Sequence, residues 1–114
     1  MESILDSIKD MLGIRSDYTY FDDTIIADIN SVFSVLTQLG VGPTTGFYIR
    51  DGTTVWNEYL SDDSRLEFIK TYIYLRVRLM FDPPQTGPLI ESINRQIEEL
   101  QFRINVAVDP NINV

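Results

Sequence analysis

The 114-residue sequence contains no cysteine and no histidine. These absences exclude a disulfide, a thiolate or imidazole metal site, and a Ser/His or Cys/His catalytic pair. Apolar runs are short, since none approaches the ~18 residues that a bilayer-spanning helix requires. The first ten residues, MESILDSIKD, alternate charge instead of placing an apolar segment after a basic one. We therefore expect no signal peptide, no membrane-spanning segment and a single small domain.

Basic residues are also few, with nine Lys and Arg against 17 Asp and Glu, for a net charge of -8. The imbalance is uneven, because residues 1–30 carry seven acids and two bases whereas residues 65–80 carry four bases and one acid. An acidic chain lacks the basic surface that drives affinity for nucleic acid. Tight DNA binding is therefore not expected, and the acidity would let DNA slide past without being gripped.

Two amphipathic helices are predicted in the first forty residues. Residues 2–12 place their apolar side chains on one face and end at Gly13. Residues 22–39 form a longer helix that ends at Gly40. Its apolar stripe consists of Ile25, Ile29, Val32, Phe33, Leu36 and Leu39.

The opposite face of the second helix carries no charge. It consists of Ala27, Asn30, Ser31, Ser34, Thr37 and Gln38. A helix face turned fully to water usually collects Lys and Glu. This face is therefore either an exposed surface that happens to be neutral or a surface that packs against something else, and Ser31 and Ser34 are candidate subunit-interface residues.

Residues 40–60 interrupt the helical period. Asp51-Gly52 lies between FYIR and TTVW, a pattern that favours a tight turn between two strands. We expect a short β-hairpin or an ordered loop near residues 47–56. Trp56 is expected to pack this segment onto the helices, because its large apolar area stabilises whatever covers it.

The next predicted helix, residues 64–81, starts at a capping box formed by Ser64 and Glu67. Its apolar side chains form two stripes roughly 130 degrees apart. One stripe consists of Leu66, Ile69, Ile73, Val77 and Met80, and the other of Phe68, Tyr72, Leu75 and Leu79. Such a helix is either buried between two layers of its own fold or lies between its own core and another subunit.

The second alternative defines candidate subunit-interface residues, namely Phe68, Tyr72, Leu75, Arg76 and Leu79. Arg76 has no acidic residue three or four positions away on either side, so its partner lies elsewhere in the fold or on a neighbour. Arg78 can pair with Asp82 one turn later. Pro83 and Pro84 then end the helix, because neither offers a backbone donor and Pro83 disfavours helical geometry at the residue before it.

Gly87 and Pro88 fit the start of a last helix, which should fold back antiparallel after so short a connection. Its apolar seam is Ile90, Ile93, Ile97, Leu100 and Ile104, and its ion-pair ladder is Glu91, Arg95, Glu99 and Arg103. Several residues outside this seam or beyond it are candidate contacts to a partner protein: Phe102, Val106, Val108, Asp109 and Pro110. The sequence thus predicts a mainly α bundle of about four helices, with one domain over residues 1–106 and a flexible tail over residues 107–114.

No arrangement of residues indicates catalysis, a cofactor or a metal site. The adjacent carboxylates Asp22-Asp23 and Asp62-Asp63 each precede a predicted helix, where acids bind free backbone amides. The glycines of GVGPTTG have no lysine to meet a phosphate. An acidic helical interaction protein, such as a DNA mimic that inhibits a DNA-binding enzyme, is the alternative class, although the acids are spread over caps and ladders. A small hydrolase or nuclease is less favoured because it would need convergent carboxylates.

The order of features resembles that of the small helical head-tail connector proteins of long-tailed bacteriophages and prophages. The resemblance spans nearly the whole chain and rests on five segments: SILDSIKDMLGI, INSVFSVLTQLGVGP, VWNEYL, TYIYLRVRLMFDPP and INRQIEELQFRINV. It departs at Phe102, where relatives often carry tryptophan.

This resemblance implies a structural subunit of the virion neck that is made in the host cytoplasm. Such subunits form a ring of about a dozen copies beneath the portal protein. The ring extends the channel through which phage DNA passes without specific binding, and it presents a platform for a stopper or tail-side neck protein.

Overall fold

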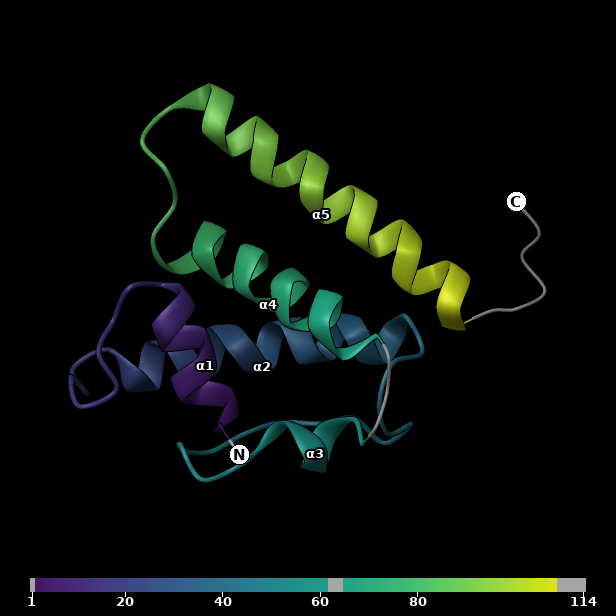
Figure 1. The fold of residues 1–114 in the computed structure, drawn as a ribbon, viewed down its shortest axis with the longest axis horizontal. Helices are drawn as coiled ribbons and strands as arrows, with labels where there is room; N and C mark the ends of the chain where they lie inside the picture. The colour runs from purple at the N-terminus through teal and green to yellow at the C-terminus, as the bar shows by residue number, and fades with distance from the viewer. Residues whose placement is uncertain (1, 62–64, 109–114) are drawn as a thin grey trace.

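A computed structural model gives the structure of residues 2–61 and 65–108, which form a small helical domain (Figure 1). The helices are α1 (Ile4–Met11), α2 (Asp22–Gln38), α3 (Trp56–Tyr59), α4 (Leu66–Phe81) and α5 (Gly87–Val108). The mainly α prediction, with its long antiparallel helix pair, is confirmed. No helix in these two ranges is long and apolar enough to cross a membrane.

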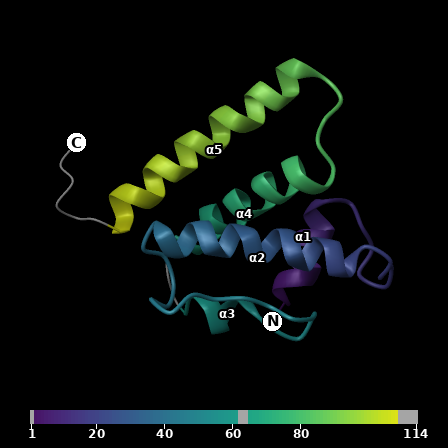
Figure 2. The same cartoon turned by 180° about the vertical axis from the view of Figure 1, so that it is seen from behind.

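The centre of the fold is α4, which is covered on almost every side. Of its sixteen residues only Glu67 and Met80 are exposed. Its main contacts are with α2 and α5, and α1 packs against both α2 and α4 (Figures 1 and 2). Side chains of both predicted stripes are buried here, including Ile69 and Ile73 of one and Tyr72 of the other. The chain itself therefore supplies both layers that cover this helix.

Trp56 anchors the segment between α2 and α4, as predicted. Its side chain is 2 % exposed, and the indole Nε1 donates to Ser7 Oγ of α1 at 2.8 Å. The Lys70 ammonium lies 5.3 Å from the centroid of the Trp56 ring. Ile4 N–H also donates to the Thr54 carbonyl at 2.9 Å, so α1 and this segment hold each other in place.

Residues 47–54 form an ordered loop and not a hairpin within the described part of the chain. The Asn30 side chain of α2 takes both backbone groups of Ile49, accepting from its N–H at 2.8 Å and donating to its carbonyl at 2.9 Å. Asp51 Oδ1 accepts from Thr53 N–H at 2.9 Å, and its hydrogen bond with the Thr53 hydroxyl lowers the Asp51 pKa. Because Ile49 is bonded to a helix side chain, the Asp51-Gly52 turn does not continue into a strand pair.

Three predicted features of the second half have different outcomes. Arg78 donates to the Tyr74 hydroxyl at 3.2 Å and forms no ion pair with Asp82. In the predicted ladder, Arg103 pairs with Glu99 at 2.7 Å. Ser64 of the capping box, the Asp62-Asp63 pair and residues 109–114 lie outside the described residues.

The buried ammonium of Lys9 fixes the connection between α1 and α2. Its Nζ donates to the carbonyls of Ser16 at 3.1 Å and Tyr18 at 2.8 Å, and it lies 2.7 Å from Asp22 Oδ1. Lys9 is 0 % exposed. A buried charge is tolerated only when it is paired and hydrogen-bonded, and here three oxygen atoms from the connection and the start of α2 satisfy it.

Replacing Lys9 by methionine is expected to lower the free energy of unfolding by about 3 kcal/mol, because it leaves Asp22 and two carbonyls without their donor. Chemical denaturation followed by circular dichroism measures the change. The control is Arg103→Met, which removes an equally short ion pair whose side chains are 60 % and 63 % exposed. That control should cost less than about 0.5 kcal/mol. Equal losses of unfolding free energy in Lys9→Met and Arg103→Met would show that burial of the Lys9 ammonium adds nothing to stability.

Candidate interaction surfaces

The uncharged face of α2 is open to solvent. Ala27, Ser31, Ser34 and Gln38 are all exposed. Ser31 Oγ donates to the Ala27 carbonyl at 3.1 Å, and Ser34 Oγ donates to the Asn30 carbonyl at 3.3 Å. Because both hydroxyls already donate within the helix, a partner can cover this face without leaving a donor unpaired.

The predicted interface residues of α4 differ in accessibility. Tyr72 and Leu75 lie in the chain's own core, at 0 % and 5 % exposed. Phe68 and Leu79 are partly buried and pack against that core. A contact between subunits through the predicted α4 residues therefore remains a prediction. Among their apolar side chains, only those of Phe68 and Leu79 are accessible to a neighbour.

Arg76 finds its nearest partner within α4. Its guanidinium donates to the Tyr72 hydroxyl at 3.3 Å and lies 5.6 Å from the centroid of that ring. It lines a small groove between α4 and α5 together with Leu79, Met80 and Asn94. Among the described residues no carboxylate lies within ion-pair distance of Arg76, so its charge is not neutralised inside the fold.

The candidate partner contacts at the end of the chain lie along α5 or beyond it. Phe102 is 55 % exposed and Val106 is partly buried. Val108 is the last residue of α5. The side chain of Val108 and all of Asp109 and Pro110 lie outside the part that the structure describes.

A second exposed apolar surface was not identified in the sequence analysis. We call Tyr18, Tyr20, Phe21 and Phe81 the aromatic cluster. Tyr20 and Phe81 both meet the Phe21 ring edge to face, with centroids 4.9 and 5.3 Å from it, and the Tyr18 centroid lies 6.0 Å from Phe21. Tyr20 is 79 % exposed and Tyr18 is 51 % exposed. The run YTYF before α2 was the available signal, but it does not reveal the contact with Phe81 at the end of α4.

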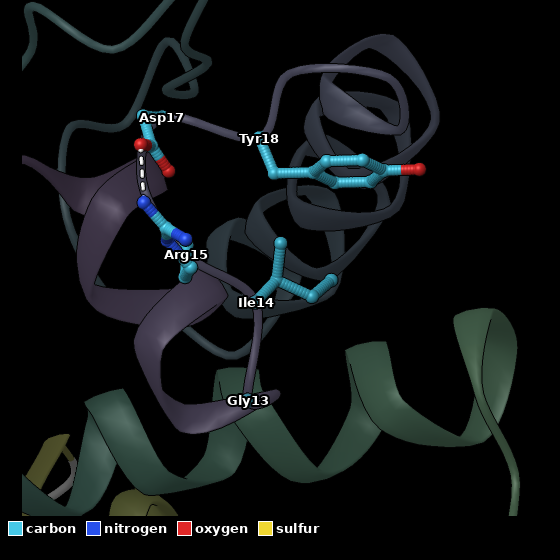
Figure 3. A pocket seen from close by; sticks show the side chains of 5 residues that line it. All are labelled: Gly13, Ile14, Arg15, Asp17 and Tyr18. Carbon is cyan, nitrogen blue, oxygen red and sulfur yellow. Dashed lines mark hydrogen bonds and ion pairs between the residues drawn. The ribbon is translucent and has the colours of Figure 1, made fainter.

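Two open hollows border the aromatic cluster. One, of about 510 Å³, has the side chains of Ile14 and Tyr18 on one side and an ion pair of 2.7 Å between Arg15 and Asp17 on the other (Figure 3). The second hollow shares Ile14 and is lined by both Phe21 and Phe81. Neither hollow brings nucleophiles or carboxylates together, and in the described ranges no group of His, Cys, Asp or Glu side chains could hold a metal ion. These surfaces are suited to contacts with macromolecules.

Exposed apolar surfaces on a small domain often mark sites of contact with other proteins. A family model described as phage connector protein matches residues 4–111, and the chain belongs to that family. This membership gives the chain a structural connector role in the phage particle. Neither the curated proteins nor the solved structures give a match.

Asp28 is a partly buried acidic residue within α2. One of its carboxylate oxygens, Oδ2, is buried and has no hydrogen-bond partner among the described residues. Burial therefore raises the pKa of Asp28 above its ordinary value of 3.8. The folded chain binds this proton more tightly than the unfolded chain, so the contribution of Asp28 to stability falls as the pH rises from 3.8 through the raised pKa.

Asp28→Asn is expected to raise the melting temperature at neutral pH, since the amide carries no charge that burial disfavours. The gain should disappear at pH values below the ordinary carboxyl pKa, because Asp28 of the parent is then protonated in both the folded and the unfolded chain. Thermal melts across that pH range provide the measurement. Asp23→Asn, which changes an exposed aspartate of the same helix, should give no gain. A gain for Asp28→Asn that is independent of pH would contradict the assignment.

Proposed function

We propose that this connector protein is a ring subunit that docks beneath the portal, extends the DNA channel and joins the capsid to a stopper or other tail-side neck protein. The observation that carries the proposal is the family match, which spans residues 4–111 of the 114. A connector at this position works in the virion neck after assembly in the host cytoplasm. The fold needs no catalytic group for this task, because the work is done by contacts between surfaces.

The uncharged face of α2 supports assembly with neighbouring copies. It exposes Ser31 and Ser34, whose hydroxyls already donate to backbone carbonyls of their own helix. Covering such a face costs little desolvation, because it carries no charge and no unpaired hydroxyl hydrogen. A cyclic ring of about a dozen copies, as the resemblance implies, needs two different surfaces on each subunit, and this face would provide one of them.

The net charge of -8 supports passage of DNA without binding. Several acids are engaged by cations within the chain, including Asp17 by Arg15 and Glu99 by Arg103. The distribution does not favour a DNA mimic, which would present its carboxylates together on one exposed face. The acidity therefore fits a channel component better than an inhibitor of a DNA-binding enzyme.

The end of α5 is the proposed site of portal docking. Its principal contacts within the chain are with α4, so its outer face is available to a partner (Figure 1). Phe102 is exposed on α5, and Val106 and Val108 follow it toward the C-terminal end of the helix. Asp109 and Pro110 continue the chain from there and would extend the contact.

Introducing glutamate at both Ser31 and Ser34 is expected to abolish ring formation, because each ring contact would then bury unpaired charges. Exposed substitutions of this kind usually change stability by less than about 0.5 kcal/mol, so the variant should stay folded. Native mass spectrometry of the protein, alone and mixed with its portal, measures the assembly. Asn57→Glu on the exposed side of α3 is the control and should assemble normally. Rings of the double variant would rule out this face as a contact.

Deleting residues 109–114 is expected to abolish portal docking while the helical circular dichroism spectrum stays unchanged. The physical reason is that the deletion leaves the described helices intact and removes only the proposed extension of the α5 contact. Co-sedimentation with the portal measures docking. A second variant, Phe102→Ala, should weaken docking without affecting the fold, since Phe102 is half exposed. Unimpaired docking by the truncated chain would exclude a role for this segment.

A further inference from the structure

The aromatic cluster is a pre-ordered contact surface. Phe21 lies at the centre of the ring contacts, and the buried Lys9 ammonium holds the carbonyl of Tyr18 and the carboxylate of Asp22 on either side of it. Tyr18 N–H also donates to the Arg15 carbonyl at 3.0 Å. Exposed aromatic side chains that are already fixed lose little conformational entropy when a partner covers them. The cluster can therefore contribute to binding at low entropic cost.

The charge around the cluster is negative and unbalanced. Asp23 and Asp82 are exposed, and in the described residues no cation pairs with them. They lie in or next to the segments that carry the aromatic rings, and Asp82 directly follows Phe81. The cations of this region, Lys9 and Arg15, are already occupied by Asp22 and Asp17. A partner should therefore bring an apolar or aromatic surface together with at least one cation.

The same chain carries a surface of that kind beside the uncharged face of α2. Tyr48 is 58 % exposed, and the Arg50 guanidinium donates to its hydroxyl at 2.8 Å and lies 5.4 Å from its ring centroid. Tyr48 lines one hollow together with Asn30 and Ser34, so the tyrosine and the uncharged face are continuous. We call Tyr48, Arg50, Ser31 and Ser34 the Tyr48 surface.

Arg50 is a cation that a neighbour can use. It is exposed, and within the described ranges no acid lies within ion-pair distance of its guanidinium. Arg95 is also exposed and has no ion pair, but Glu91 and Glu99 lie one helical turn before and after it and offset its charge. Arg50 is followed by Asp51, which it attracts without forming an ion pair, and it has an exposed aromatic side chain beside it, which matches the composition of the aromatic cluster.

The two surfaces cannot meet within one molecule. The aromatic cluster lies at the beginning of α2, where Phe21 directly precedes the helix, whereas the Tyr48 surface lies over its C-terminal half (Figure 2). Ser34 lies thirteen residues after Phe21, or about 20 Å along the helix at the rise of ~1.5 Å per residue. Two different complementary surfaces on one chain generate a head-to-tail contact between copies, which closes into a ring when the rotation allows.

We propose that the aromatic cluster of one copy receives the Tyr48 surface of the next copy, with Arg50 approaching the exposed carboxylates of Asp23 and Asp82. This inference rests on the proposed ring and names the two surfaces that form it. The aromatic rings would supply the buried apolar area of the contact, and Arg50 with the carboxylates would fix its register.

Two complementary variants test the contact. Tyr20→Asp disables the aromatic cluster and leaves the Tyr48 surface intact, whereas Arg50→Glu does the reverse. Both side chains are exposed, so circular dichroism should show folded chains. Each variant alone should associate at least about tenfold more weakly than the parent, and neither should form rings. An equal mixture should form one-to-one heterodimers that grow no further, because each pair keeps one intact contact, and native mass spectrometry resolves the two chains by mass.

The matched control is Leu89→Asp, which changes a 54 % exposed apolar side chain outside both surfaces and outside the proposed portal contact, and it should form rings like the parent. Rings formed by Tyr20→Asp or by Arg50→Glu alone would overturn the contact while leaving the ring proposal in place. A mixture that stays monomeric, although the parent forms rings, would overturn it equally. If Tyr20→Asp forms rings but no longer binds the tail-side neck protein, the cluster belongs to that partner and the proposal is wrong. A parent that forms no ring even with its portal would overturn the ring and the contact together.

Discussion

The apolar circumference of α4 is the constraint on which the architecture depends. A helix with apolar side chains on two sides is stable in water only if both sides are covered, and α2 and α5 provide that cover within one chain. Burial of Tyr72 and Leu75 therefore contributes to the fold of the single subunit. As a consequence, the subunit does not need a neighbour to bury its central helix, and its contacts with other proteins can use surfaces that are separate from the core.

The buried Lys9 connects this core to the surface. Its stem lies among the packed residues of the N-terminal helix, while its ammonium takes two carbonyls and one carboxylate from the connection to α2. The loop that carries Tyr18 and Tyr20 is thereby fixed by polar contacts in addition to the packing of Leu12 and Ile14 against the core. Such an arrangement allows aromatic side chains to stay exposed in a defined position, which a loop held only by hydrophobic contacts could not achieve.

The four longer helices could be predicted from sequence because each follows a local period, and Gly or Pro lies at or near several of their ends. The single-turn helix α3 was not predicted, since four residues are too few to show a helical period. The two stripes of α4 and the anchoring role of Trp56 also follow from local spacing and residue size. Features that depend on distant residues could not be predicted in the same way. The hairpin signal at Asp51-Gly52 is overridden by Asn30, which lies 19 residues before Ile49 and occupies its backbone groups.

The candidate surfaces could also be predicted from sequence only where they depend on local spacing. The uncharged face of α2 is visible in the sequence, because a helical period and the absence of Lys and Glu suffice to recognise it. The burial of Lys9 is not visible, since two carbonyl groups must first converge on its ammonium. The aromatic cluster requires Phe21 and Phe81 to meet across 60 residues of chain, and exposure of its rings depends on how tightly the loop is held.

A structural connector acts through contacts between surfaces, so the order in which its surfaces are covered matters for assembly. Self-association between an acidic aromatic surface and a surface with one cation would be weakened by salt, because its charges lie at an exposed rim. The end of α5 carries mainly apolar candidates, and a contact of that kind depends less on ionic strength. At low concentration the chains would then stay apart, because all of them carry a net negative charge. The portal would bind the apolar end of α5 and so bring the chains together before their charged surfaces meet. Docking and ring closure would thus reinforce each other, since each copy bound to the portal raises the local concentration of the next.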